Sequence, residues 1–83
     1  MEHYLLVARS ITHAQQMMKI LEQAGIPVRV RRAGHTLTGR GCGYTLDIAA
    51  KQYSAAILRL QQSQQTPIKV FKVENGRKVE VSL

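Results

Sequence analysis

The chain has 83 residues, with twelve Lys and Arg against five acidic residues and a formal net charge of +7. This length allows one domain, spanning 1–83, and leaves no room for a second. A hydrophobic content of 45% argues against disorder. No apolar stretch approaches the ~20 residues of a membrane span, so we expect no membrane association. The positive charge fits an anionic partner or simply a soluble cationic surface.

The single cysteine bears on the cellular compartment in which the protein is expected. Cys42 is the only cysteine, so the chain cannot form an internal disulfide. No charged-then-apolar signal segment precedes the first apolar run. We therefore expect a soluble protein in a reducing compartment, the cytoplasm.

The N-terminal part of the chain predicts a strand followed by a helix. Residues 3–8 form a short, nearly continuous apolar run, which is typical of a central strand. Thr12 and Gln15 have capping-box spacing, with Ser10 as the other candidate cap. Gly25 stands where a helix commonly ends in a left-handed residue. The apolar face of this helix repeats at three- and four-residue steps: Ala14, Met17, Met18, Leu21 and Ala24.

The next segment predicts a half-buried strand and a loop. Residues 26–31 place Val28 and Val30 on one face, and Arg29 and Arg31 on the other. Residues 32–43 carry four glycines and few apolar side chains, which indicates a loop.

The second half predicts a strand, a helix and a hairpin. Residues 44–48 alternate as a strand, and a helix is expected over 50–64, with Asp47 as its cap. Asn75-Gly76 is a strong hairpin signal that pairs residue 70 with 81 and residue 68 with 83. The order of elements predicts an α+β domain of the ferredoxin-like split βαβ type, βαββαβ plus a final strand.

This topology places the thiol near a helix start. The first and third strands of a ferredoxin-like sheet are antiparallel neighbours, so the loop before the third strand lies where the first helix begins. Free N–H groups at a helix start favour an anion, and a thiol there should ionise readily. The residues expected around Cys42 are Ser10, Thr12, His13, His35, Arg40, Gly41 and Gly43.

Other interpretations of these residues remain open. Most free cysteines are small buried hydrophobes, so Cys42 is a core residue in one interpretation and a reactive thiolate in the other. His13 is either a solvated residue of the first helical turn, which we expect, or a general base. The three histidines and Cys42 lack the spacing of metal ligands, so we expect no metal and no cofactor.

Several segments resemble a known family, the small selenium/sulfur carrier-like proteins. The likeness covers roughly residues 3–62 and is carried by Tyr4–Val7, Ser10-Ile11-Thr12-His13, Ala24-Gly25-Ile26-Pro27-Val28-Arg29 and Cys42-Gly43. The cysteine thought to hold the chalcogen in that family corresponds to Cys42. The resemblance implies a carrier that takes sulfur or selenium from a donor protein and passes it to an acceptor enzyme, and is not itself a catalyst.

Two other classes of function fit the sequence. The first is a basic binding module for nucleic acid or an acidic protein, with a surface made of Arg29, Arg31, Lys69, Phe71 and Lys72. The paired aromatic residues with which RNA-binding ferredoxin-like domains stack bases are missing, so nucleic acid is the less favoured partner. The second is a structural or regulatory module that forms a homodimer through an open sheet edge.

Overall fold

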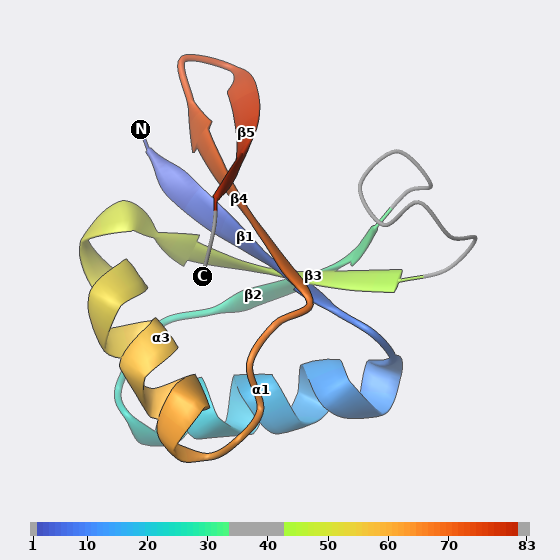
Figure 1. Ribbon diagram of the computed structural model, residues 1–83. Helices are drawn as coiled ribbons and strands as arrows, with labels where there is room; N and C mark the ends of the chain where they lie inside the picture. The colour runs from blue at the N-terminus through green and yellow to red at the C-terminus, as the bar shows by residue number, and fades with distance from the viewer. Residues whose placement is uncertain (1, 34–42, 82–83) are drawn as a thin grey trace.

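The described part of the chain folds into one five-stranded sheet with two α-helices packed on one of its faces (Figure 1). The computed structural model describes residues 2–33 and 43–81. The predicted α+β class, with five strands and two helices, is confirmed. The elements in chain order are β1 (His3–Ala8), α1 (Ile11–Gln23), β2 (Arg29–Ala33), β3 (Gly43–Ala49), the 3₁₀ helix η1 (Ala50–Gln52), α3 (Tyr53–Gln62), β4 (Lys69–Glu74) and β5 (Arg77–Val81).

All neighbouring strands of the sheet are antiparallel, in the order β2-β3-β1-β4-β5. The central strand β1 pairs with β3 on one side and β4 on the other. With β5 at its edge, the five-stranded order differs from that of a four-stranded ferredoxin-like sheet, so the finer fold assignment stays a prediction. The two described edges are β2 and β5.

The core lies between the sheet and the helices. Alternate residues of β1 point into it, because side chains along a strand alternate between the two faces. Leu6 of β1 is fully buried and packs with helix residues of the predicted apolar stripes. The fully buried side chains of this layer include Leu6, Leu46, Val70, Ala14, Met17, Leu21, Ala56 and Leu60.

Helix α1 begins and ends with well-formed caps. Ser10 is the N-cap, and its Oγ accepts the His13 backbone N–H at 3.1 Å, so Ser10 and not Thr12 makes the cap. Gly25 has φ of 76°, as expected for the left-handed residue after a helix. The Ile26 N–H donates to the Leu21 carbonyl at 2.9 Å, which closes the helix end in a Schellman motif.

The C-terminal hairpin has the predicted turn and register. Asn75 and Gly76 both have positive φ, 50° and 77°, as a two-residue type I′ turn requires. Val70 pairs with Val81 as expected. The predicted partner of Ile68 lies outside the described residues.

Three predicted boundaries are wrong. The loop expected over 32–43 is shorter at both ends, because Arg32 and Ala33 belong to β2 and Gly43 begins β3. The second strand begins at Arg29 and not at residue 26, because Ile26 closes α1 and Pro27 has no N–H to donate to a strand partner. The predicted helix over 50–64 is a 3₁₀ turn followed by α3, which ends at Gln62. Gln64 then takes φ of 57°, a left-handed conformation that no glycine signals in the sequence.

Candidate functional site

The start of β3 and the start of α1 lie at the same end of the sheet (Figure 1). Tyr44 pairs with Ala8, and Arg9 and Ser10 lead from there directly into α1. Gly43 pairs with Ala33 on β2. The structure therefore brings Ser10, Thr12, His13 and Gly43 to one end of the sheet. The other residues expected at the site, His35, Arg40, Gly41 and Cys42, lie outside the described residues.

His13 is buried within this end of the molecule, contrary to the expectation of a solvated residue. Only 2% of the side chain is exposed. Its Nδ1 accepts the Arg9 backbone N–H at 3.1 Å, which assigns the remaining ring proton of the neutral form to Nε2. Nε2 is buried and has no hydrogen-bond partner among the described residues. The imidazole therefore links α1 to the end of β1. Its Nδ1 already accepts a hydrogen bond and is not available to act as a general base.

The charge state of His13 follows from this position. Burial lowers the pKa of His13 below its ordinary value of 6.5, and the Arg9 guanidinium lowers it further. The backbone of Gln65 and Thr66 opposes this shift of the pKa, although neither residue forms a hydrogen bond of good geometry with Nε2. His13 is therefore neutral at physiological pH.

The surface at this end is positively charged. Arg9, Arg31 and Arg32 are exposed, and the first turn of α1 contains no acidic residue. The free N–H groups at the start of the helix add partial positive charge. This arrangement favours an anion, whether a bound ligand or a thiolate.

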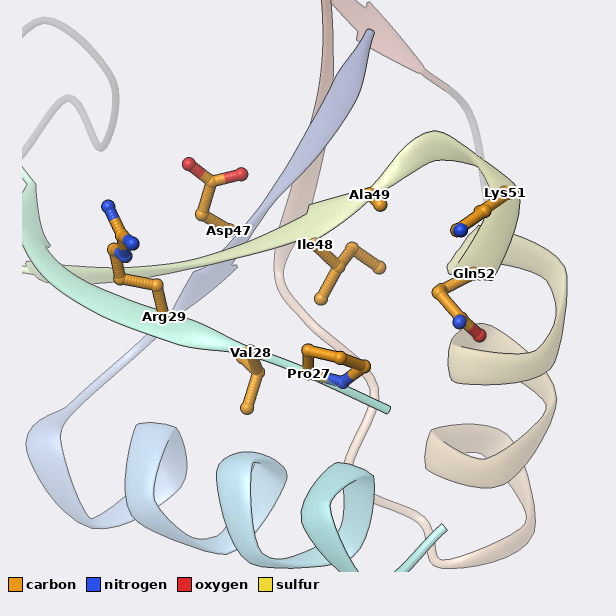
Figure 2. Close-up of a pocket in the computed structure, with 8 residues that line it drawn as sticks. All are labelled: Pro27, Val28, Arg29, Asp47, Ile48, Ala49, Lys51 and Gln52. Atoms are coloured by element: carbon orange, nitrogen blue, oxygen red, sulfur yellow. The ribbon is translucent and has the colours of Figure 1, made fainter. Parts of the chain in front are cut away.

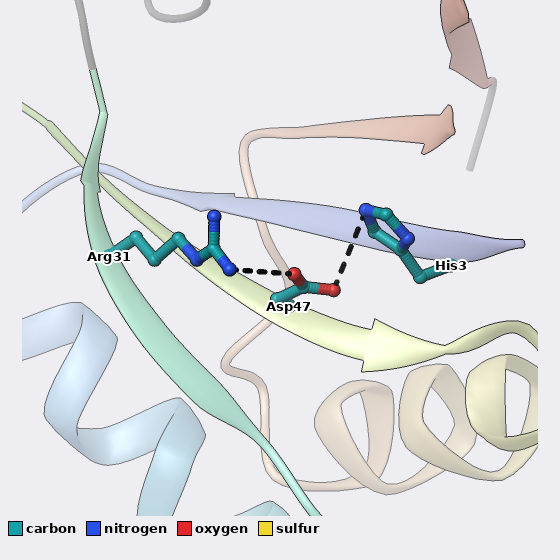
Figure 3. Close-up of polar contacts among 3 residues, drawn as sticks. All are labelled: His3, Arg31 and Asp47. Carbon is teal, nitrogen blue, oxygen red and sulfur yellow. Dashed lines mark ion pairs between the residues drawn. The ribbon is translucent and has the colours of Figure 1, made fainter. Parts of the chain in front are cut away.

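Asp47 lies in the middle of β3 and does not cap the second helix as expected. One carboxylate oxygen is 3.8 Å from His3 Nε2, and the other is 4.0 Å from an Arg31 guanidinium nitrogen (Figure 3). The three residues come from three neighbouring strands. They lie on the face of the sheet that the two helices leave uncovered, and no side chain forms a cap hydrogen bond at the start of α3.

Tyr4 and Tyr53 form an aromatic contact that sequence reasoning missed. Their ring centroids are 3.8 Å apart and the rings are tilted by 12°, so they stack. Burial raises the pKa of Tyr53, and the neighbouring Tyr4 raises it further. The pair fastens the start of α3 to β1. The two residues are 49 positions apart, so no local pattern signals the contact.

A cavity of about 350 Å³ lies at the other end of β3 (Figure 2). It is formed where β2 begins and where β3 runs into η1. Gly43 and Ala49 are opposite ends of β3, roughly 20 Å apart at the usual rise of a strand. This cavity is therefore separate from the end of the sheet where α1 starts. Pro27 is the feature of the sequence that could have predicted this cavity, because a proline before a strand limits strand pairing at that point.

Residues 2–33 and 43–81 contain no group of three His, Cys, Asp or Glu side chains arranged to hold a metal ion. Within the same ranges, no helix has the length and apolarity to cross a bilayer.

Comparison with known proteins identifies the family. A family model described as "Putative Se/S carrier protein-like" matches residues 3–72, which is most of the chain. The chain belongs to this Se/S carrier-like family. No curated protein and no solved structure matches it. The match extends from β1 into β4, so the Se/S carrier-like domain includes both helices and the whole central part of the sheet.

Proposed function

We propose that the protein carries sulfur or selenium on the thiol of Cys42 and passes it to a partner enzyme. Membership of the Se/S carrier-like family supports a carrier role in general. The persulfide or selenosulfide on Cys42 and the transfer to a partner are the specific parts of the proposal. Residues 1–83 act in it as one ferredoxin-like domain, with β5 added to the sheet.

The transfer needs no external oxidant. The Cys42 thiolate attacks the terminal sulfur of a persulfide on the donor protein. One S–S bond forms on Cys42, the donor's S–S bond breaks, and the electron pair leaves with the donor's thiolate. The acceptor's nucleophile then takes the terminal sulfur from Cys42 in the same way. Selenium in place of the terminal sulfur gives the equivalent selenosulfide step.

One observation carries the proposal: Gly43, the chain neighbour of Cys42, begins β3 at the end of the sheet where α1 starts. Two exposed cations lie there: Arg9 is in the link between β1 and α1, and Arg32 pairs with Tyr44 at the start of β3. Positive charge and a helix start both stabilise a thiolate. In this proposal Cys42 is the chalcogen-carrying group, and Arg40, His35, Gly41 and Gly43 contribute to binding.

The roles of the α1 residues differ from one another in this proposal. Ser10 and His13 hold the backbone of the helix start, since Ser10 Oγ accepts the His13 N–H and His13 Nδ1 accepts the Arg9 N–H. Thr12 is exposed in the first turn and is available to contact the donor or acceptor. No residue of this set needs to act as a base, because the thiolate is the attacking species.

The test is the intact mass of the protein after incubation with a small-molecule persulfide donor such as glutathione persulfide. We expect the mass of one added sulfur atom, removed by a thiol reductant and absent from Cys42→Ser. Selenium loading is followed in the same way with a selenosulfide donor. A chain that stays unmodified, or that reacts only after denaturation, would contradict the carrier proposal.

The helix-free face of the sheet supports a second candidate, a binding module for an acidic protein. The strand register aligns Arg29 with Phe71 across this face. It aligns Arg31 with Lys69 two residues further along the strands. Lys72, which was expected in this surface, pairs with Tyr4 on the other face and lies 3.7 Å from Glu74. Salt-sensitive binding of an acidic protein by Cys42→Ser, unchanged from the native chain, would favour this candidate.

A further inference from the structure

Strand β5 forms an open edge of the sheet. It pairs with β4 on one side, and no other strand in residues 2–33 and 43–81 pairs with it. Figure 1 shows the tip of the β4–β5 hairpin well away from both helices. Residues 77–80 are exposed, and Val79 in the middle of β5 has 53% of its surface exposed. An edge of this kind presents unpaired backbone groups to another strand.

The hairpin register decides which backbone groups face that edge. Glu74 and Arg77 close the two-residue turn as a hydrogen-bonded pair, and such pairs recur at every second residue of an antiparallel ladder. Val79 therefore directs its N–H and C=O groups toward β4, whereas Lys78 and Glu80 direct theirs toward the open edge. A strand that docks there can form hydrogen bonds with both of these residues.

The side chains of the same two residues carry opposite charges. Lys78 pairs with Val73 and Glu80 pairs with Phe71, so both project from the face of the sheet that the helices leave uncovered. Neither Lys78 nor Glu80 forms an ion pair with another residue in the described ranges. The outward-facing positions of the edge thus present one cation and one anion.

A second copy of β5 complements this pattern. When two β5 strands pair antiparallel about a twofold axis through Val79, Lys78 of each copy lies opposite Glu80 of the other. Both are hydrogen-bonded pairs, because these residues direct their backbone groups outward. The two Val79 residues form the non-hydrogen-bonded pair between them, where Cα atoms approach to about 4.5 Å and the exposed side chains cover one another. Backbone, charge and apolar contacts therefore agree in this register.

Other registers and the other edge lack this agreement. A shift by two residues places Lys78 opposite Lys78 or Glu80 opposite Glu80, and like charges directly opposite one another are unfavourable. A shift by one residue sets outward-facing backbone groups against inward-facing ones. Strand β2, the other described edge, carries Arg29, Arg31 and Arg32 and no acidic residue, so two β2 strands would bring arginines together.

We propose that the protein forms a homodimer through β5, in which the two sheets continue into one another across the twofold axis. The interface is a single edge of five residues, so association should be weak, with a dissociation constant on the order of 0.1 mM. Strand β5 lies outside residues 3–72 of the family match and at the opposite edge of the sheet from β2. The dimer is therefore independent of the Cys42 chemistry.

Sedimentation velocity of the full chain measures the association. Between about 10 µM and about 1 mM protein, the weight-average mass should rise from that of the monomer toward that of the dimer. About 0.15 M salt is needed, because the net charge of +7 on each copy opposes association and screening limits this repulsion to about 8 Å. Concentration-dependent amide shifts in NMR spectra should be concentrated in residues 77–81.

Charge reversals test the register. Lys78→Glu and Glu80→Lys should each weaken association about tenfold, because both ion pairs become like-charge pairs. An equimolar mixture of these two variants should associate like the native chain, and so should the Lys78→Glu, Glu80→Lys double variant. Lys51→Glu on η1 and Glu22→Lys on α1 make the same charge changes at exposed positions outside β5 and should leave association unchanged. A thermal melt of each variant shows whether it is folded.

Four results would overturn the proposal. The first is a native chain that stays monomeric up to about 1 mM. The second is association that neither charge reversal weakens. The third is a mixture of the two reversed variants that associates no better than either variant alone. The fourth is binding of an added acidic peptide at β5 by a chain that does not self-associate, since the partner would then be another protein. None of these results affects sulfur loading of Cys42, so the two proposals fail separately.

Discussion

The Nδ1 atom of His13 accepts the backbone N–H of Arg9 at 3.1 Å, across the junction between β1 and α1. The protonated ring cannot accept this hydrogen bond, because both ring nitrogens then carry a proton. The buried neutral imidazole is therefore part of the folded structure. Stability should depend on pH through this residue.

The sign of that dependence follows from the lowered pKa of His13 in the folded state. The unfolded chain binds a proton near the ordinary pKa of 6.5, whereas the folded chain binds it only at lower pH. The stabilisation is complete above pH 6.5 and is lost as the pH falls through the window below it. Urea unfolding from about pH 8 down to about pH 5 should show this loss.

His13→Gln provides the comparison for the pH experiment. This variant should be less stable by about 1–3 kcal/mol at neutral pH, because the Arg9 N–H loses its acceptor. Its stability should fall less steeply below pH 6.5 than that of the native chain. His3 and His35 remain in both proteins, so the difference between the two curves isolates His13. Parallel curves would show that His13 does not titrate in this way.

The N-cap of α1 predicts a difference between two neighbouring hydroxyl residues. Ser10→Ala should lower the free energy of unfolding by about 1 kcal/mol, because the His13 N–H loses its side-chain acceptor. Thr12→Ala should change it by less than about 0.5 kcal/mol, since Thr12 is exposed and makes no cap. Ser10→Asp should retain the cap. Equal effects at Ser10 and Thr12, measured by urea unfolding, would contradict the assignment.

Gln64 offers a stabilising substitution. Its φ of 57° is costly for a residue with a side chain, whereas glycine adopts it freely. Gln64→Gly should therefore raise the free energy of unfolding by about 1 kcal/mol. Gln62→Gly, at the last residue of α3, should lower it by a similar amount. Destabilisation by both substitutions would show that Gln64 is not left-handed in solution.

The two outward-facing arginines of β2 should contribute little to stability. Arg31 is 58% exposed and its pair with Asp47 spans 4.0 Å, so solvent screens the attraction. The Arg29→Gln, Arg31→Gln double variant should be within about 0.5 kcal/mol of the native chain. A large fall in melting temperature would mean that these side chains hold the sheet together.

Alkylation by iodoacetamide tests the state of the Cys42 thiol. We expect an apparent pKa of the thiol below the ~8.5 of a free cysteine. Each unit of lowering corresponds to about 1.4 kcal/mol, more than an exposed helix start supplies, so arginine must contribute. Arg40→Ala should raise this pKa, whereas Lys78→Ala, on β5, should leave it unchanged. A native thiol that titrates at or above the free value would indicate a structural cysteine.

Local sequence patterns were sufficient for most of the elements. The apolar repeat through Ala14, Met17 and Leu21 predicted the face of α1 that is buried. Gly25 and Asn75-Gly76 predicted two of the three places where the described chain has a positive φ, and Gln64 is the third. These signals work because helix periodicity, strand alternation and the sterics of a left-handed residue act over only a few neighbouring positions.

Other features were decided by tertiary structure. His13 has the same neighbours in sequence whether it is solvated or buried, and only the packing of α1 beside the end of β1 encloses it. Asp47 was expected to cap a helix, but its partners come from two other strands. The stacking of Tyr4 on Tyr53 likewise requires the folded sheet.

Local patterns were thus enough to predict the kinds and order of the elements and the turn at Asn75-Gly76, and the match over residues 3–72 gave the family. Tertiary structure decided that His13 is neutral and buried, and that β2 and β3 separate beyond Arg29 to leave a cavity. The difference lies in the sequence distance over which the interactions act. Turns and amphipathic faces depend on adjacent residues, whereas burial, ion pairing and cavities depend on surfaces that meet only when distant segments pack together.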